Sequence, residues 1–375
     1  MKIIAFYLPQ FHSIPENDEW WGDGFTEWTN VKAAKALFEN HNQPRIPLNN
    51  NYYNLLNDDV KQWQVDLANK YGVYGFCFYH YWFDGKMLLE KPVNQFLKNK
   101  KLNTHFCLCW ANEAWTNAWA AKDAKVLIEQ RYGREDEWKK HFEYFLPFFQ
   151  DSRYIQEDNK PLLVIYRPEL IDCLNEMLDY WNELAIKNGF DGINFAYQHI
   201  SFALSSKYDD SRFKYAIEYH PNCARTLKDM EHNASAKRIK KGIVTWVEKH
   251  FGINLQEKKK QMQGLGHFDY DEVWEYILSM KPRNDKCGPG AFVDWDNTPR
   301  RNKTGYVADG ASPEKFEKYL TKQIINAKQN YKKDMMFIFS WNEWAEGGYL
   351  EPDTKNKYGY LEAIYEALEK TNELE

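Results

Sequence analysis

Two glutamates near the end of the chain, Glu343 and Glu346, have the type and spacing that acid–base chemistry requires. They follow the apolar run 335–339 and precede Gly347 and Gly348. The apolar run predicts a buried strand, and the paired glycines predict a sharp turn at its exit. We expect this turn to direct both carboxyl groups into one cleft. Two carboxyl groups in one cleft suit glycosidic chemistry, because one protonates the glycosidic oxygen while the other acts on the opposite side of the reaction.

The two glutamates have different roles in this interpretation. Glu346 is predicted to act as general acid and base at the glycosidic oxygen, and Glu343 as a base or hydrogen-bond partner for a hydroxyl of the reacting sugar. The alternative is that both are surface residues of a loop, which is the commonest state of glutamate. Their neighbours Trp341, Asn342 and Trp344 favour the catalytic interpretation.

The elements that position this pair follow a repeated pattern. Apolar runs predict strands over 2–8, 73–79, 104–110, 162–166, 193–198, 215–219, 291–295 and 335–341. Helical patterns cover 58–71, 91–99, 135–149, 168–187, 270–280, 313–332 and 358–370. This alternation predicts an α/β fold, a (β/α)₈ TIM barrel, and an open doubly wound sheet is the competing architecture. The barrel is favoured because no glycine-rich nucleotide turn follows the first strand.

The barrel is predicted to be a single catalytic domain spanning residues 1–375. Two segments interrupt the alternation: a long loop over 9–56 after the first strand, and an insertion over 221–288 after the sixth strand, which we expect to be mostly helical. The loop includes the tryptophan-dense stretch 20–28. This stretch predicts either a binding surface or a small hydrophobic core that covers the barrel mouth, and Trp28 is a candidate substrate contact.

Aromatic and polar residues gather where the predicted strands end, and the carboxyl ends of barrel strands meet at one face. The pattern predicts an aromatic-lined polar cleft; the alternative is that these residues only cap the barrel core. The candidate substrate-binding residues are Tyr7, Tyr79, His80, Tyr81, Trp82, Trp110, Asn112, Glu113, Tyr166, Tyr219, Asp294, Trp295, Asp296, Trp341, Asn342 and Trp344. An oligo- or polysaccharide is the expected partner, because indole and phenol rings suit the apolar faces of sugars.

The spacing of Asp294 and Asp296 is also found where a divalent metal holds the diphosphate of a nucleotide sugar. The motif is short enough to occur by chance, so we predict no metal and no other cofactor. Phosphate-loop, dinucleotide, zinc-protease and serine-hydrolase motifs are absent from the sequence.

Composition excludes several classes of protein. The net charge of −5 gives no basic footprint for nucleic acid, and no apolar run is long enough for a membrane span. Aromatic residues make up 17% of the chain, with 15 Trp, 25 Tyr and 23 Phe. The first residues lack the features of a signal peptide, and the six cysteines show no paired spacing. We therefore expect a cytoplasmic, disulfide-free protein.

Six segments together resemble the WbsX-type proteins of bacterial O-antigen and capsule clusters, which are often labelled glycosyltransferases. They are AFYLPQFH (5–12), TEWTNV (26–31), FCFYHYWF (76–83), CWANE (109–113), WDNTPRR (295–301) and WNEWAEG (341–347). The resemblance runs from residue 1 to about residue 365. The same pattern is similar, more distantly, to glycoside hydrolase family 99, the endo-acting α-mannosidases and mannanases.

The hydrolase resemblance implies a (β/α)₈ barrel and retention of anomeric configuration through a 1,2-anhydro sugar. It implies that Glu343 deprotonates the 2-hydroxyl of the sugar and that Glu346 is acid and then base at the leaving oxygen. The leading prediction is an enzyme that acts on glycosidic bonds of a bacterial surface polysaccharide. The alternatives are a glycosyltransferase that uses a nucleotide- or lipid-linked donor and a non-catalytic glycan-binding barrel.

Overall fold

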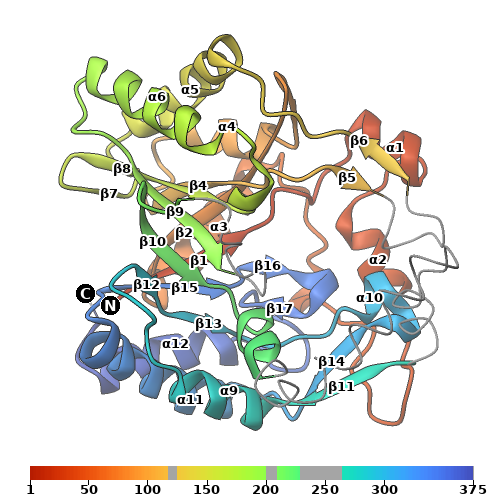
Figure 1. The fold of residues 1–375 in the computed structure, drawn as a ribbon. Coiled ribbons are helices and arrows are strands. Elements are labelled where there is room, and N and C mark those ends of the chain that lie inside the picture. Colours follow the sequence, from red (N-terminus) through yellow and green to blue (C-terminus); the bar gives the residue numbers. More distant parts are fainter. Residues whose placement is uncertain (117–124, 200–208, 229–263, 375) are drawn as a thin grey trace, which may run out of the picture.

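The structure is a computed structural model that describes residues 1–116, 125–199, 209–228 and 264–374. Its main sheet is a nearly closed barrel in the order β12-β10-β9-β8-β4-β2-β1-β15-β13, with parallel pairing along this path (Figure 1). The strands are β1 (Lys2–Tyr7), β2 (Val73–Phe83), β4 (His105–Trp110), β8 (Lys160–Ile165), β9 (Asn194–His199), β10 (Phe213–Glu218), β12 (Cys287–Gly288), β13 (Gly290–Phe292) and β15 (Met335–Phe339). The predicted (β/α)₈ barrel is confirmed.

Strands β12 and β13 are two parts of one run that closes the barrel. Pro289 separates them, because its nitrogen carries no hydrogen to donate to a neighbouring strand. The first part pairs with β10 and the second with β15, so the run takes the place of an eighth strand. Gly290 permits this closure: a Cβ atom added there would lie 1.7 Å from the carbonyl oxygen of Glu218.

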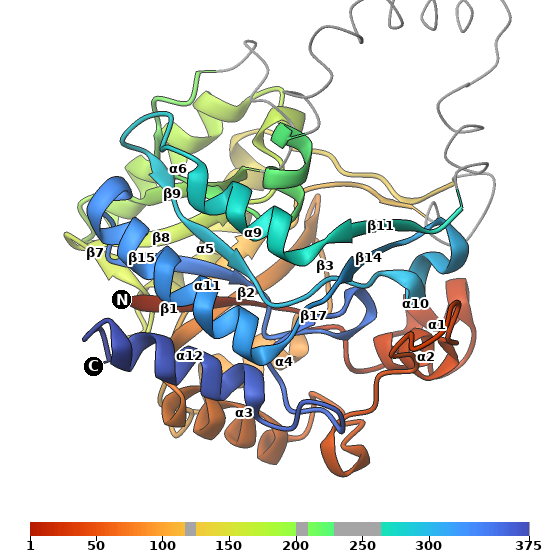
Figure 2. The same ribbon diagram turned by 90° about the horizontal axis from the view of Figure 1, so that it is seen from below.

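The helices form the outer layer around the strands (Figures 1 and 2). They are α3 (Asp58–Lys70), α4 (Lys91–Lys98), α5 (Glu135–Phe149), α6 (Leu174–Lys187), α9 (Tyr270–Ser279), α11 (Pro313–Asn326) and α12 (Gly359–Lys370). Local sequence explains two of the starts. The side chain of Asn57 accepts a hydrogen bond from the backbone N–H of Asp59, and Ser312 caps α11 in the same way through Lys315.

A further group of short elements covers the carboxyl end of the barrel, away from the two chain ends (Figures 1 and 2). The predicted loop 9–56 contains α1 (Pro15–Trp21) and α2 (Glu27–Ala33). Near them lie α10 (Thr298–Arg301) and the hairpin of β5 (Trp115–Thr116) with β6 (Val126–Ile128). The other short strands are β3 (Lys86–Leu88), β11 (Gly266–Asp269), β14 (Tyr306–Asp309), β16 (Asn342–Glu343) and β17 (Gly348–Tyr349), whereas β7 (Gln156–Glu157) pairs with the amino end of β8.

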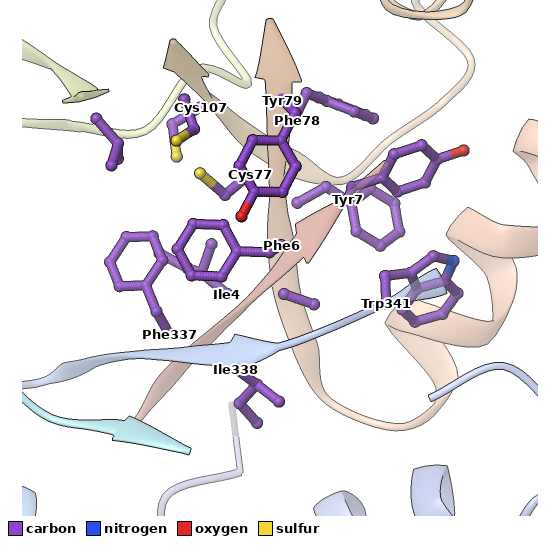
Figure 3. Packing of buried hydrophobic residues seen from close by; sticks show 14 of the residues in the cluster. Ile4, Phe6, Tyr7, Cys77, Phe78, Tyr79, Cys107, Phe337, Ile338 and Trp341 are labelled. Carbon is purple, nitrogen blue, oxygen red and sulfur yellow. The ribbon is translucent and has the colours of Figure 1, made fainter. Parts of the chain in front are cut away.

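Successive side chains of each barrel strand point alternately to the barrel interior and to the helix layer. Phe6 points inward, where its ring centroid lies 5.7 Å from that of Tyr79 and 5.5 Å from that of Phe337. Tyr7, the next residue, points the other way and donates a hydrogen bond to Gln64 of α3. Figure 3 shows this divergence among the buried hydrophobic residues. The core is therefore continuous on both faces of the strands, as expected for a parallel barrel covered by helices.

The predicted insertion over 221–288 is only partly described. Its described part contains β11 and α9, whereas residues 229–263 lie outside the described residues. All six cysteines of the chain are buried and free. In the part of the chain that the structure describes, no helix has the length and apolar character needed to cross a membrane.

Candidate active site

A cavity of about 380 Å³ opens at the carboxyl end of the barrel strands. It is lined by Leu8, Gln10, Asn17, Trp21, Phe25, Glu27, Tyr79, Tyr81, Ala111, Glu113, Ala114, Trp115, Thr116, Leu127, Tyr166, Tyr219, Arg300, Arg301, Glu343 and Glu346. Aromatic rings and carboxyl groups therefore share one concave surface. This composition suits a ligand that has both apolar faces and hydroxyl groups.

Glu343 and Glu346 line the same cavity because the chain turns sharply between β16 and β17. Residues Trp344–Glu346 form a single 3₁₀ turn, and Gly347 follows with φ of +72°. The predicted turn is present, and it places both carboxyl groups on one wall. The backbone carbonyl of Glu346 accepts a hydrogen bond from the N–H of Asp296 at 2.7 Å, which fixes the turn against the end of β13.

Arg300 of α10 contacts both glutamates. Its Nη1 donates a hydrogen bond to Glu346 Oε1 at 3.0 Å, and its Nη2 forms an ion pair with Glu343 Oε1 at 3.0 Å. The same Nη2 lies 3.0 Å from Oε2 of Glu27, a residue of α2. One guanidinium thus joins the carboxyl group of Glu27 in α2 to those of Glu343 and Glu346 in the closing segment.

Burial raises the pKa of Glu343 well above its ordinary value, and the nearby charges of Glu346 and Glu27 raise it further, while Arg300 opposes them. The side chain of Glu343 is only 5% exposed, whereas that of Glu346 is 23% exposed. A carboxyl group with a raised pKa keeps its proton at a pH where an exposed carboxyl group has lost it. The pair therefore combines one deeply buried carboxyl group with one that is open to the cavity.

Seven of the predicted site residues line the cavity: Tyr79, Tyr81, Glu113, Tyr166, Tyr219, Glu343 and Glu346. Strand alternation explains the selection along β2 and after β4, since only every second residue of a strand faces the interior. In β2, Tyr79 and Tyr81 face the cavity, whereas His80 packs against His141 of α5 with 2.9 Å between their Nε2 atoms. After β4, Ala111 and Glu113 face it in the same way.

The other predicted residues do not line the cavity, and their side chains are buried in the scaffold. They are Tyr7, Trp28, His80, Trp82, Trp110, Asn112, Asp294, Trp295, Asp296, Trp341, Asn342 and Trp344. Burial lowers the pKa of His80 to about 3, so this imidazole is neutral. Trp82 stacks on His141 with 4.4 Å between ring centroids. Only the first set lines the cavity.

The Asn-Glu pairs at 112–113 and 342–343 share one arrangement. Asn112 donates to the carbonyl of Arg167 and accepts from its N–H, both at 2.7 Å. Asn342 accepts from the N–H of Leu8 at 2.8 Å and donates to its carbonyl at 3.0 Å. Each asparagine therefore fixes the end of a neighbouring strand, and the glutamate that follows it, Glu113 or Glu343, lines the cavity.

Asp294 and Asp296 are structural anchors in this fold. Asp294 forms an ion pair with Arg45 at 2.8 Å, and Asp296 accepts hydrogen bonds from His41 at 2.9 Å and Gln43 at 2.7 Å. Although burial alone would raise it, the hydrogen bond from His41 and the charge of Arg45 lower the pKa of Asp296 to about 2. Neither carboxylate lines the cavity, so the metal-binding alternative gains no support from this pair.

Comparison with known proteins identifies the family. A family model described as glycosyltransferase WbsX matches residues 3–364. The chain belongs to the WbsX family. The WxcX protein of Xanthomonas campestris pv. campestris strain B100 is 35% identical over 373 residues, which cover 98% of this chain and 49% of that protein. The WxcX protein of a second strain is 34% identical, and the match again covers 98% of this chain and 49% of that protein. The chain spans about half the length of these curated relatives.

Solved structures confirm the fold of this WbsX family member. An endo-α-mannosidase of glycoside hydrolase family 99 from Bacteroides thetaiotaomicron superposes with a TM-score of 0.55 and 14% identity, over 99% of this chain and 97% of that chain. A glycoside hydrolase-like protein superposes with a TM-score of 0.53 and 12% identity, over 98% and 93%. At these identities the likeness establishes the barrel and nothing about the reaction.

Two cavity residues of this WbsX family member, Glu27 and Arg300, were not among the predicted site residues. Both lie within segments that carry the family resemblance, TEWTNV and WDNTPRR. They are separated by more than half of the chain, and no local period relates them. The only signal in the sequence was their membership of those segments.

Glu351 holds the two tryptophans of the closing segment in place. Its carboxylate accepts hydrogen bonds from Tyr53 at 2.8 Å, Gln64 at 2.7 Å, Trp341 at 3.1 Å and Trp344 at 2.7 Å. The residue is buried, and burial raises its pKa to about 7 despite these donors. Trp341 and Trp344 therefore serve to position the turn that carries the two glutamates.

Glu351 is expected to make stability depend on pH. The pKa of Glu351 is about 7 in the folded state, whereas the ordinary value for glutamate is about 4.3. Between these two pH values the carboxyl group keeps its proton in the folded state and has lost it in the unfolded state. The contribution of Glu351 to the free energy of unfolding should fall by roughly 3 kcal/mol as pH rises from about 4 to about 7. Denaturant unfolding across this range should show a smaller decrease in Glu351→Gln, which cannot titrate. If the free energy of unfolding changes equally with pH in the wild type and in Glu351→Gln, this prediction is wrong. Glu275→Gln, at an exposed position, is the control and should match the wild type.

Proposed function

We propose that this WbsX family member is a carbohydrate-active enzyme that cleaves or transfers glycosidic bonds of a bacterial surface polysaccharide, such as an O-antigen or capsule. The observation that carries the proposal is the shared cavity of Glu343 and Glu346, whose other walls include Tyr79, Tyr81 and Trp115. Rings of this kind can pack against the apolar faces of sugars while the carboxyl groups act on the glycosidic bond.

The exposure of the two glutamates supports distinct roles. Glu346 is the more exposed, so it can approach the glycosidic oxygen as general acid and later act as base toward the incoming hydroxyl group. Glu343 lies deeper and would accept the proton of a hydroxyl group on the reacting sugar. With the 2-hydroxyl as internal nucleophile, the first step gives a 1,2-anhydro sugar, and opening of that ring by an acceptor retains the anomeric configuration.

Transfer to a sugar acceptor from a nucleotide- or lipid-linked donor is the second candidate. The family description as a glycosyltransferase favours it. Hydrolysis and transfer differ in whether water or a sugar hydroxyl opens the intermediate. Both reactions need an acid that protonates the departing oxygen. The exception is a leaving group that departs readily without a proton, such as a nucleoside diphosphate.

The test is a screen of the purified chain against α-mannans, bacterial O-antigens and a panel of nucleotide sugars, with and without Mn²⁺, read by mass spectrometry. We expect shortened or extended glycan products with the wild type and none with the Glu343→Gln, Glu346→Gln double variant. Consumption of a nucleotide sugar would assign the protein to the transferases. If the double variant binds glycan normally and the wild type turns over nothing, the barrel is a glycan-binding protein and the proposal fails.

A further inference from the structure

Asn17 of α1 lines the cavity, although the sequence did not mark it as a site residue. The residue is only 6% exposed, and its amide forms no hydrogen bond with any residue that the structure describes. Gln10, the second amide among the lining residues, donates a hydrogen bond to the hydroxyl group of Tyr81 at 2.7 Å. Buried polar side chains nearly always have a partner, so the free amide of Asn17 indicates a partner that enters the cavity.

The backbone that carries Asn17 is held in place by its own segment. Pro15 begins α1, and Asp18 accepts hydrogen bonds from the backbone N–H groups of Gly24 at 2.9 Å and Phe25 at 3.2 Å. These bonds fix α1 to the chain that leads to α2. A ligand that binds the amide therefore does not have to order this part of the backbone first.

Aromatic rings line the cavity near α1. Trp21 lies four residues after Asn17, so both side chains occupy one face of the helix, and both line the cavity. The ring of Trp115 lies 5.9 Å from that of Trp20 and 5.2 Å from that of Tyr81. Because Trp115 and Tyr81 also line the cavity, its aromatic wall continues from α1 to β2.

An amide next to indole rings suits a neutral ligand that carries hydroxyl groups. The carbonyl oxygen of asparagine accepts hydrogen bonds while its NH₂ group donates them. Adjacent hydroxyl groups of one sugar ring can satisfy both, because each hydroxyl group donates and accepts. An anionic group would be bound more strongly by arginine or lysine. Indole rings can pack against the apolar face of the same sugar.

We propose that Asn17 is a specificity-determining residue whose amide binds adjacent hydroxyl groups of a sugar in the bound glycan. The inference deepens the proposed function and rests on it for the class of ligand. Asn17 forms no hydrogen bond with Glu343, Glu346 or Arg300, which belong to the part of the chain that the structure describes. Its hydrogen bonds therefore contribute to glycan binding and not to proton transfer.

The first test measures binding of α-mannan and purified bacterial O-antigens to the full chain by isothermal titration calorimetry. Asn17→Leu and Asn17→Ala remove both hydrogen bonds of the amide. Each should raise the Kd of a glycan that the wild type binds by about tenfold, the effect of two hydrogen bonds between neutral groups. Where that glycan is turned over, KM should rise by about the same factor while kcat stays nearly unchanged. Glu19→Ala, at an exposed position of the same helix, is the matched control and should bind like the wild type.

The second test separates a contact with ligand from a structural role by urea unfolding. Asn17 has no hydrogen bond to lose within the described residues, so Asn17→Leu should keep or raise the urea midpoint of the wild type. Asn112→Leu is the comparison, since it removes two hydrogen bonds to the backbone of Arg167 and should lower the midpoint.

The inference is wrong if both Asn17 variants bind glycan as tightly as the wild type. It is also wrong if both are destabilised as much as Asn112→Leu. Either result leaves the proposed function intact when Glu343→Gln and Glu346→Gln still abolish turnover. A wild type that binds glycan through Asn17 and converts none would refute the proposed function alone. If the wild type binds none of these glycans, both proposals fail.

Discussion

Replacement of Glu346 by glutamine is expected to lower the turnover of an unactivated glycan by about 10²- to 10⁴-fold, the usual contribution of a general acid. The amide has the same shape as the carboxyl group but cannot donate an acidic proton to the departing oxygen. An aryl glycoside of the same sugar, whose leaving group needs no protonation, should lose far less activity. Steady-state turnover of the two substrates, compared in one preparation, measures this difference.

Glu343→Gln should lower turnover in a different pattern from Glu346→Gln. If Glu343 removes a proton from the attacking hydroxyl, its loss slows the first step whatever the leaving group, and both substrates should be affected alike. Glu275→Gln on the exposed face of α9 is the control, and it should turn over both substrates at the wild-type rate. If Glu346→Gln loses equal activity on both substrates, the roles of Glu346 as general acid and Glu343 as base are wrongly assigned.

Gly290→Ala is expected to cause a larger loss of stability than alanine at any other glycine of the barrel strands. Its Cβ would lie 1.7 Å from a backbone oxygen of β10, which has no flexible end to move aside. The strand that closes the barrel would have to separate from β10 or bend away from it. We expect the free energy of unfolding to fall by roughly 4 kcal/mol or more, or the protein not to fold. Urea or guanidinium unfolding, followed by far-ultraviolet circular dichroism, measures the loss.

Gly288→Ala is the matched control, only two residues away in the same run. The nearest atom to an added Cβ there is 3.8 Å distant, an ordinary contact. We therefore expect this variant to keep its stability or to gain up to about 1 kcal/mol through a less flexible unfolded chain. Equal stability of the two variants would show that β10 and β13 do not meet as closely as the structure places them.

The regular elements could be predicted from the sequence because each depends on a local pattern. Helix α5 begins and ends at the predicted residues, and the predicted strand over 73–79 is the first part of β2. The strand over 291–295 was placed too late, since the run that closes the barrel starts at Cys287 and is interrupted by Pro289. Glycine and proline weaken an apolar strand signal, and here they occur where the barrel closes.

The candidate site was predicted less completely, for two physical reasons. Strand residues alternate in direction, and the sequence does not state which parity faces the interior, so Tyr7 and His80 were grouped with Tyr79 and Tyr81. The second reason is distance along the chain. Arg300 meets Glu27 only after the barrel has closed, and no local pattern relates residues of α10 and α2.

The outward-facing and inward-facing side chains along β2 and β4 have different structural roles, and this difference has a consequence for protein engineering. Outward-facing residues such as His80, Trp110 and Asn112 hold the framework together, while their inward-facing neighbours Tyr79 and Tyr81 line the cavity. A combinatorial library confined to Tyr81 and Ala111 would therefore vary the cavity walls and leave the hydrogen bonds of His80, Trp110 and Asn112 in place. Selectivity for a new sugar could be sought there without first rebuilding the protein's stability.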